Sequence, residues 1–84
     1  MNKVVSLVVE NTSGIDALLA QKVVKVASEF ESDIILRYLN KEVDLKSILG
    51  IMSLAVLEGA EIEIIAKGND AEETIETIKK MLIK

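Results

Sequence analysis

The stretch LKSILGIMSLAVLEGAEIEIIAK, residues 45–67, carries a helix signal followed directly by a strand signal. Ser47 is a residue type that caps helix N-termini, and it precedes a short apolar segment that closes at Gly59. From Ala60 to Ala66 acidic residues alternate with isoleucines, which is the period-two pattern of a strand with one buried face. The stretch therefore predicts a short helix that leads into a strand.

Upstream, a strand and a helix are predicted in the first third of the chain. Lys3 to Val9 is rich in β-branched residues and reads as a strand. A cluster of turn formers at residues 11–14 leads to Asp16, which stands at the N-cap position of a helix starting at Ala17. The helical period is indicated by apolar residues that recur at three- and four-residue steps: Ala20, Val23, Val24, Ala27 and Phe30.

A hairpin is predicted in the middle of the chain. Asp33 to Tyr38 reads as one strand and Lys41 to Leu45 as a second. Only Leu39-Asn40 separates them, and asparagine tolerates the left-handed conformation that a two-residue turn requires.

The last element predicted is an amphipathic helix. Asp70 is its candidate cap, and Glu73 follows at the spacing of a capping box. Its buried stripe is predicted to consist of Ala71, Ile75, Ile78 and Leu82. Lys79, Lys80 and Lys84 fall in the last turn, where cations complement the helix dipole.

The element order is therefore β-α-β-β-α-β-α within one domain spanning residues 1–84. Single strands and a hairpin together predict a mixed or antiparallel sheet with the helices on one face. This is an α+β two-layer sandwich.

Composition excludes several classes of function. The chain has no cysteine and no histidine, which rules out disulfides, thiolate chemistry and phosphohistidine, and we expect neither a metal site nor a cofactor. A net charge of −4 argues against nucleic-acid binding through phosphate neutralisation. No apolar run approaches the ~20 residues that span a bilayer, so we expect a soluble cytoplasmic protein without membrane contact.

Two motifs resemble the HPr family, the histidine phosphocarriers of the bacterial sugar phosphotransferase system. They are LKSILGIMSLAV with the following EGAEIEIIAKGNDAEE, and TSGIDA near the N-terminus. The resemblance covers essentially the whole chain and implies an open-faced sandwich of four antiparallel strands with three helices on one face. The absence of histidine makes the chain similar to Crh, a His-lacking paralogue.

The resemblance aligns the family's phosphoacceptor histidine with Asp16. The arginine that helps hold the phosphate falls on Leu18, and the following proline falls on Leu19. Asp16 could be a plain N-cap, worth ~1 kcal/mol, or a fixed negative charge that imitates phosphohistidine. It could also accept phosphate itself as a carboxylate nucleophile, which would make the chain a phosphocarrier.

The resemblance also implies a protein-docking patch. Leu18 is expected to enlarge an apolar surface of the second helix, whereas Leu19 is the better candidate to fold inward. An apolar surface of this kind marks a partner site. The residues assigned to partner binding are Asp16, Leu18, Leu19, Lys46, Ile48, Leu49 and Met52. The partner could be another protein or a second copy, so monomer and homodimer are both open.

Ser47 aligns with the serine that HPr kinase/phosphorylase modifies in this family. A phosphate at an N-cap adds about −1.5 to −2 charges at the positive end of a helix. The phosphorylated relatives act as corepressors of a catabolite control transcription regulator, although Leu18 removes an arginine from that contact. We therefore expect a non-enzymatic regulatory protein of carbon catabolite control. A scaffold without phosphorylation is the remaining alternative.

Overall fold

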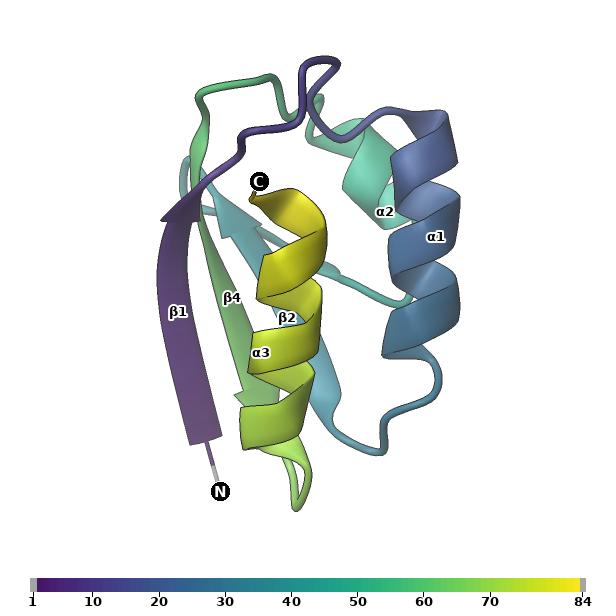
Figure 1. Ribbon diagram of the computed structural model, residues 1–84, viewed down its shortest axis with the longest axis vertical. Coiled ribbons are helices and arrows are strands. Elements are labelled where there is room, and N and C mark those ends of the chain that lie inside the picture. The colour runs from purple at the N-terminus through teal and green to yellow at the C-terminus, as the bar shows by residue number, and fades with distance from the viewer. Residues whose placement is uncertain (1, 84) are drawn as a thin grey trace.

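A computed structural model describes residues 2–83 of the chain. Three helices and four strands follow one another in the predicted order βαββαβα (Figure 1). Their bounds are β1 (Asn2–Val8), α1 (Ala17–Ala27), β2 (Asp33–Tyr38), β3 (Lys41–Asp44), α2 (Ile48–Ser53), β4 (Glu61–Lys67) and α3 (Ala71–Leu82). β1 and β4 are each shifted by one residue from the predicted ranges, β3 is one residue shorter than predicted, and Lys84 lies outside the described residues.

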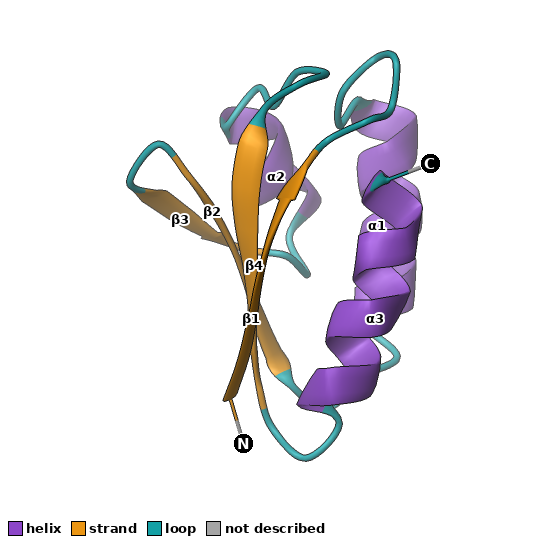
Figure 2. Cartoon of the chain, turned by 60° about the vertical axis from the view of Figure 1, so that its left-hand side comes forward, coloured by secondary structure: helices purple, strands orange, loops and turns teal. Residues whose placement is uncertain are grey.

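The four strands form one open antiparallel sheet in the order β1-β4-β2-β3. β4 is central, and its Ile64 pairs with Val5 of β1 on one side and Leu36 of β2 on the other. All three helices lie on one face, and the other face is open (Figure 2). This arrangement confirms the predicted α+β open-faced sandwich and resolves the sheet as antiparallel.

The core lies between the sheet and the helices. Inward-facing residues of the central strands, Ile34, Leu36, Ile62 and Ile64, are at most 1% exposed. Ala71, Ile75, Ile78 and Leu82 of α3 are buried as predicted. Truncating one large buried aliphatic side chain to alanine in such a core costs about 2–5 kcal/mol.

The first helix ends earlier than its apolar pattern predicts. α1 stops at Ala27, and Phe30 lies beyond it in a turn, where its backbone N–H donates to the carbonyl of Ala27. The predicted helical position of Phe30 is therefore wrong. Lys46 stabilises the turn after α1, because its ammonium donates to the Phe30 carbonyl oxygen at 2.9 Å.

The β2–β3 turn has the conformation that its sequence predicts. Leu39 and Asn40 both have positive φ, +49° and +66°, as a two-residue hairpin turn of type I′ requires. A positive φ is sterically unfavourable for a residue with a Cβ such as Leu39. Its side chain lies in solvent, and 74% of the residue surface is exposed.

The predicted capping box of the last helix is wrong. Asp70 occupies the N-cap position of α3, but its side chain makes no capping hydrogen bond. Its carboxylate instead accepts from the backbone N–H groups of Glu31 and Ser32, at 2.8 and 3.0 Å, and from the Ser32 hydroxyl. Asp70 thus joins the β4–α3 turn to the α1–β2 turn.

These hydrogen bonds set the ionisation of Asp70. The Ser32 hydroxyl, and then the backbone N–H groups, lower the pKa of Asp70 from its ordinary value of 3.8. Ser32 itself is fully buried, and a Cβ on the neighbouring Gly68 would collide with it. The junction is tightly packed around one charged acceptor.

Asp70→Asn should lower the thermal unfolding midpoint at neutral pH. Because the folded-state pKa lies below the unfolded value, the carboxylate stabilises the fold above pH ~4, and this stability is lost as pH falls through the folded pKa. The difference in unfolding midpoint between wild type and variant should therefore disappear at acidic pH. Circular-dichroism melts across pH 2–7 measure it. Glu29→Gln, an exposed neutralisation near the same turn, is the control, and a pH-independent gap would contradict the assignment.

Candidate docking surface and phosphorylation site

A close backbone approach joins the start of α1 to the loop after α2. The N–H of Ile15 donates to the carbonyl of Val56 at 3.0 Å. Gly14 has φ +63°, and a Cβ there would collide with the Val56 carbonyl oxygen and the Leu57 Cα. Only glycine fits this contact, because it tolerates positive φ and leaves room for the neighbouring backbone. The contact places Leu57 beside the segment that leads into α1.

Five exposed apolar residues belong to the segments that meet at this junction. α2 lies beside the N-terminal half of α1 (Figure 1). Leu18 is 62% exposed, Leu49 83% and Leu57 68%, and Ile48 and Met52 are each 38% exposed. We call Leu18, Ile48, Leu49, Met52 and Leu57 the docking surface. Such a concentration of large apolar side chains in solvent is typical of a binding site.

Leu57 is the member of this surface that the sequence did not reveal. It stands in the apolar run from Leu54 to Leu57, where Leu54 and Val56 are buried and Ala55 and Leu57 are exposed. This alternation can be recognised in the sequence, but it does not indicate which part of the fold Leu57 lies beside. That information comes from the Gly14–Val56 contact.

The two leucines after Asp16 differ in their environments. Leu18 projects into solvent, whereas Leu19 is half-buried and packs against the core. The expected inward orientation of Leu19 agrees with this. Leu19 therefore contributes mainly to stability, and Leu18 is the one available to a partner.

Asp16 caps α1 with its side chain. Its Oδ1 accepts from the backbone N–H of Leu19 at 2.9 Å, and the residue is exposed. A shallow hollow of about 230 Å³ lies beside it, lined by residues 11–14 together with Asp16, Leu18, Leu19 and Lys22. The carboxylate thus occupies a helix amide that an anion would otherwise use.

Ser47 caps α2 in the same manner. Its Oγ accepts from the N–H of Gly50 at 3.0 Å, and the residue is half-buried. A Cβ on Gly50 would approach Ser47 Oγ and Val43 Cβ to 3.2 Å, which is tighter than ordinary contact. The N–H of Gly50 thus fixes the Ser47 hydroxyl directly before Ile48 and Leu49 of the docking surface, and glycine leaves room for this contact.

Lys46 has a structural role next to Ser47. Besides the Phe30 contact, its backbone N–H donates to Asp44 Oδ1 at 2.9 Å. The ammonium is held against the α1–β2 turn. A partner could bind the Lys46 ammonium only after the hydrogen bond to the Phe30 carbonyl had been broken.

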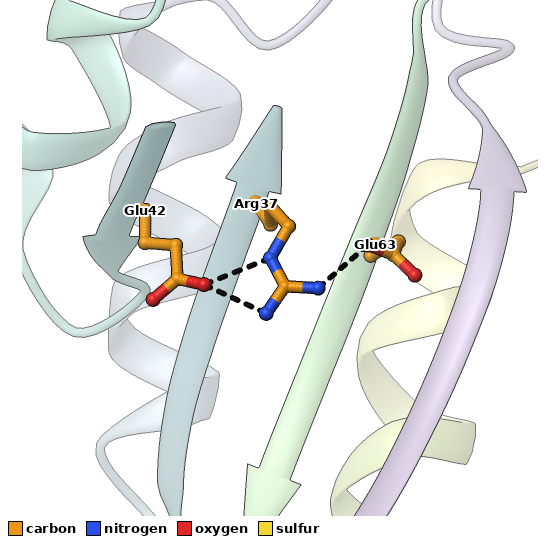
Figure 3. Close-up of polar contacts among 3 residues, drawn as sticks. All are labelled: Arg37, Glu42 and Glu63. Atoms are coloured by element: carbon orange, nitrogen blue, oxygen red, sulfur yellow. Dashed lines mark hydrogen bonds and ion pairs between the residues drawn. The ribbon is translucent and has the colours of Figure 1, made fainter. Parts of the chain in front are cut away.

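On the open face of the sheet, Arg37 is bound between two glutamates (Figure 3). Its guanidinium contacts Glu42 at 2.7 Å and Glu63 at 3.0 Å. The hydrogen bond to Glu42, and then the one to Glu63, raise the pKa of Arg37. The group links β2 to both neighbouring strands and lies on the opposite side of the sheet from the helices. Within residues 2–83 no cluster of three or more metal-ligand side chains occurs.

The sequence and the fold match a known family. The model for the PTS HPr component phosphorylation site matches residues 4–84. The chain belongs to the HPr family. This confirms the resemblance inferred from the two sequence motifs.

Solved HPr-family structures agree with this membership. The phosphocarrier protein HPr from Bacillus anthracis str. Ames superposes with a TM-score of 0.94 at 36% identity, over 96% of each chain. Crh of Bacillus subtilis, a catabolite repression protein seen as an intertwined swapped dimer, has a TM-score of 0.78 at 38% identity, over 90% of this chain and 87% of its own. An HPr dimer from Thermoanaerobacter tengcongensis has a TM-score of 0.75 at 39% identity, over 92% and 88%.

None of the helices within the described HPr-family fold is long and apolar enough to cross a membrane.

Asp16→Ala should lower the free energy of unfolding by about 1 kcal/mol, because the N–H of Leu19 loses its acceptor. Asp16→Asn should cost only a few tenths of that, because asparagine caps nearly as well. Urea denaturation of the three proteins measures the difference. If asparagine were as damaging as alanine, the negative charge rather than the cap would be what matters at this position.

Proposed function

We propose that this HPr-family chain is a non-catalytic regulatory protein that is phosphorylated on Ser47 and acts by binding other proteins through the docking surface. HPr kinase/phosphorylase is the expected modifying enzyme, in the cytoplasm, and carbon catabolite control is the process. The position of Ser47 supports this most directly. Its hydroxyl is fixed by Gly50 at the edge of the docking surface.

Phosphorylation at Ser47 would change this surface without unfolding it. The Ser47 Oγ accepts one hydrogen bond, from the N–H of Gly50. After phosphorylation a phosphate oxygen can accept from the same N–H, so this cap is kept. The modification adds about two negative charges beside apolar Ile48 and Leu49. A partner would therefore distinguish the two forms by charge.

The contacts at Asp16 favour a regulatory role over phosphate transfer. The chain has no histidine, and the carboxylate at the aligned position is engaged by the N–H of Leu19. Leu18, next but one, supplies no cation for a phosphoryl group. The same leucine argues against a transcription regulator that requires an arginine there, so the partner should present an apolar face.

Incubation with HPr kinase/phosphorylase and ATP should add one phosphoryl group, detected by intact mass. Ser47→Ala should abolish the addition. Ser53→Ala is the matched control, because Ser53 is an exposed hydroxyl at the other end of the same helix. A parallel reaction with enzyme I and phosphoenolpyruvate should leave the mass unchanged.

Two results would overturn the phosphorylation proposal. One is an unmodified chain under conditions that label an authentic HPr. The other is a phosphoryl group gained from enzyme I and lost in Asp16→Asn, which would make the chain a phosphocarrier.

Leu49→Asp should weaken binding to the kinase about tenfold or more, because a charge replaces the most exposed apolar side chain of the docking surface. Leu39→Asp is the control, since Leu39 is 74% exposed at the β2–β3 turn, outside that surface. Isothermal titration measures both affinities. Equal losses for the two variants would indicate a general charge effect and contradict a specific site.

A homodimer is the second candidate assembly. Crh of Bacillus subtilis and HPr of Thermoanaerobacter tengcongensis both occur as dimers at 38–39% identity to this chain. We propose that self-association is available to this chain as well, alongside binding to other proteins.

A further inference from the structure

The two edges of the sheet differ in length and charge. β3 forms one edge with four residues, KEVD, of which three are charged. β1 forms the other edge with seven residues, NKVVSLV, of which only Lys3 is charged. Short charged edges discourage strand addition, and long uncharged ones invite it. No segment of the described chain lies outside β1 (Figures 1 and 2).

β1 also leaves apolar side chains in solvent. Leu7 and Val9 face the core, so alternation directs Val4, Ser6 and Val8 to the open face. Val4 is 58% exposed and Val8 46% exposed. They stand at equal distances on either side of Ser6.

The backbone of the same residues is unpaired at this edge. Val9 exchanges hydrogen bonds with the β4 side, donating to Ala60 and accepting from Gly59. In an antiparallel ladder alternate residues point their N–H and C=O groups to opposite sides. Val4, Ser6 and Val8 therefore direct these groups away from β4.

We propose that a second copy of this chain pairs with β1, strand against antiparallel strand, on a two-fold axis at Ser6. This register sets Val4 opposite Val8 of the second copy, and Val8 opposite its Val4. Both valines then leave solvent together, and the free backbone groups of the two edges satisfy each other. The product is one continuous eight-stranded sheet made from two intact monomers, with no exchange of elements.

The charges of β1 permit this pairing. The two Ser6 side chains meet at the axis, and neither carries a charge. Lys3 of each copy lies opposite Val9 of the other, so the two ammonium groups are about 20 Å apart along the strands. Like charges directly opposite each other would be destabilising, and this register has none.

The docking surface remains free in such a dimer. β1 lies at one side of the molecule, and α1 and α2 lie at the other (Figure 1). The pairing does not depend on phosphorylation of Ser47, so either proposal can fail alone.

Sedimentation equilibrium of the full chain, from about 20 µM to 1 mM, tests the pairing. We expect a reversible monomer–dimer equilibrium. Ser6→Lys places two ammonium groups at the axis and should raise the dimer dissociation constant about tenfold or more. Ser6→Glu should do the same, and an equimolar mixture of the two variants should dimerise again. Gln21→Lys, with the same added charge on the exposed surface of α1, should behave as wild type.

Amide hydrogen exchange identifies the edge involved. The N–H groups of Val4, Ser6 and Val8 should exchange more slowly at high concentration, and those of β3 should not change. A monomer across the whole concentration range would overturn the proposal. So would a dimer that is insensitive to both Ser6 variants, or one whose subunits mix only over hours, which would indicate exchanged elements.

Discussion

The central strand β4 is the constraint on which this fold depends. It is hydrogen-bonded along both sides, so its backbone groups are committed to β1 and β2. Its inward side chains, Ile62, Ile64 and Ala66, are at most 1% exposed. A shift of one residue in its register would exchange this face for one that carries Glu61 and Glu63. The alternation of glutamate and isoleucine in β4 therefore fixes both the sheet and the face that the helices cover.

Local patterns predicted the elements well and the long-range polar contacts poorly. Strand alternation, helical spacing and the Leu39-Asn40 turn depend on residues close together in sequence, and they reappear in the structure except at Phe30, which lies beyond the end of α1. Asp70 shows the limit. Its position before α3 suggested a cap, but its carboxylate accepts hydrogen bonds from Glu31 and Ser32, which are 39 and 38 residues away. Nothing near Asp70 in sequence indicates that these N–H groups lack partners.

The same distinction between local patterns and long-range contacts applies to the candidate site. Both capping residues, Asp16 and Ser47, were predicted from residue type and from the helix that follows. Membership of the HPr family gave them a possible function. Leu57 and the contact of Lys46 with Phe30 were not predicted, because each depends on which loop packs against which helix. Functional assignment by motif thus captured the caps and missed part of the surface around them.

The apolar character of the docking surface has a consequence for how the proposed partner would be found. A surface of five aliphatic side chains provides no long-range attraction, so encounter should proceed at the unsteered rate of about 10⁵–10⁶ M⁻¹s⁻¹ and depend little on ionic strength. A phosphate at Ser47 would give that surface a concentrated charge of its own. The same protein would then pass from salt-insensitive to salt-sensitive recognition, and the composition of the surrounding solution would become part of the signal.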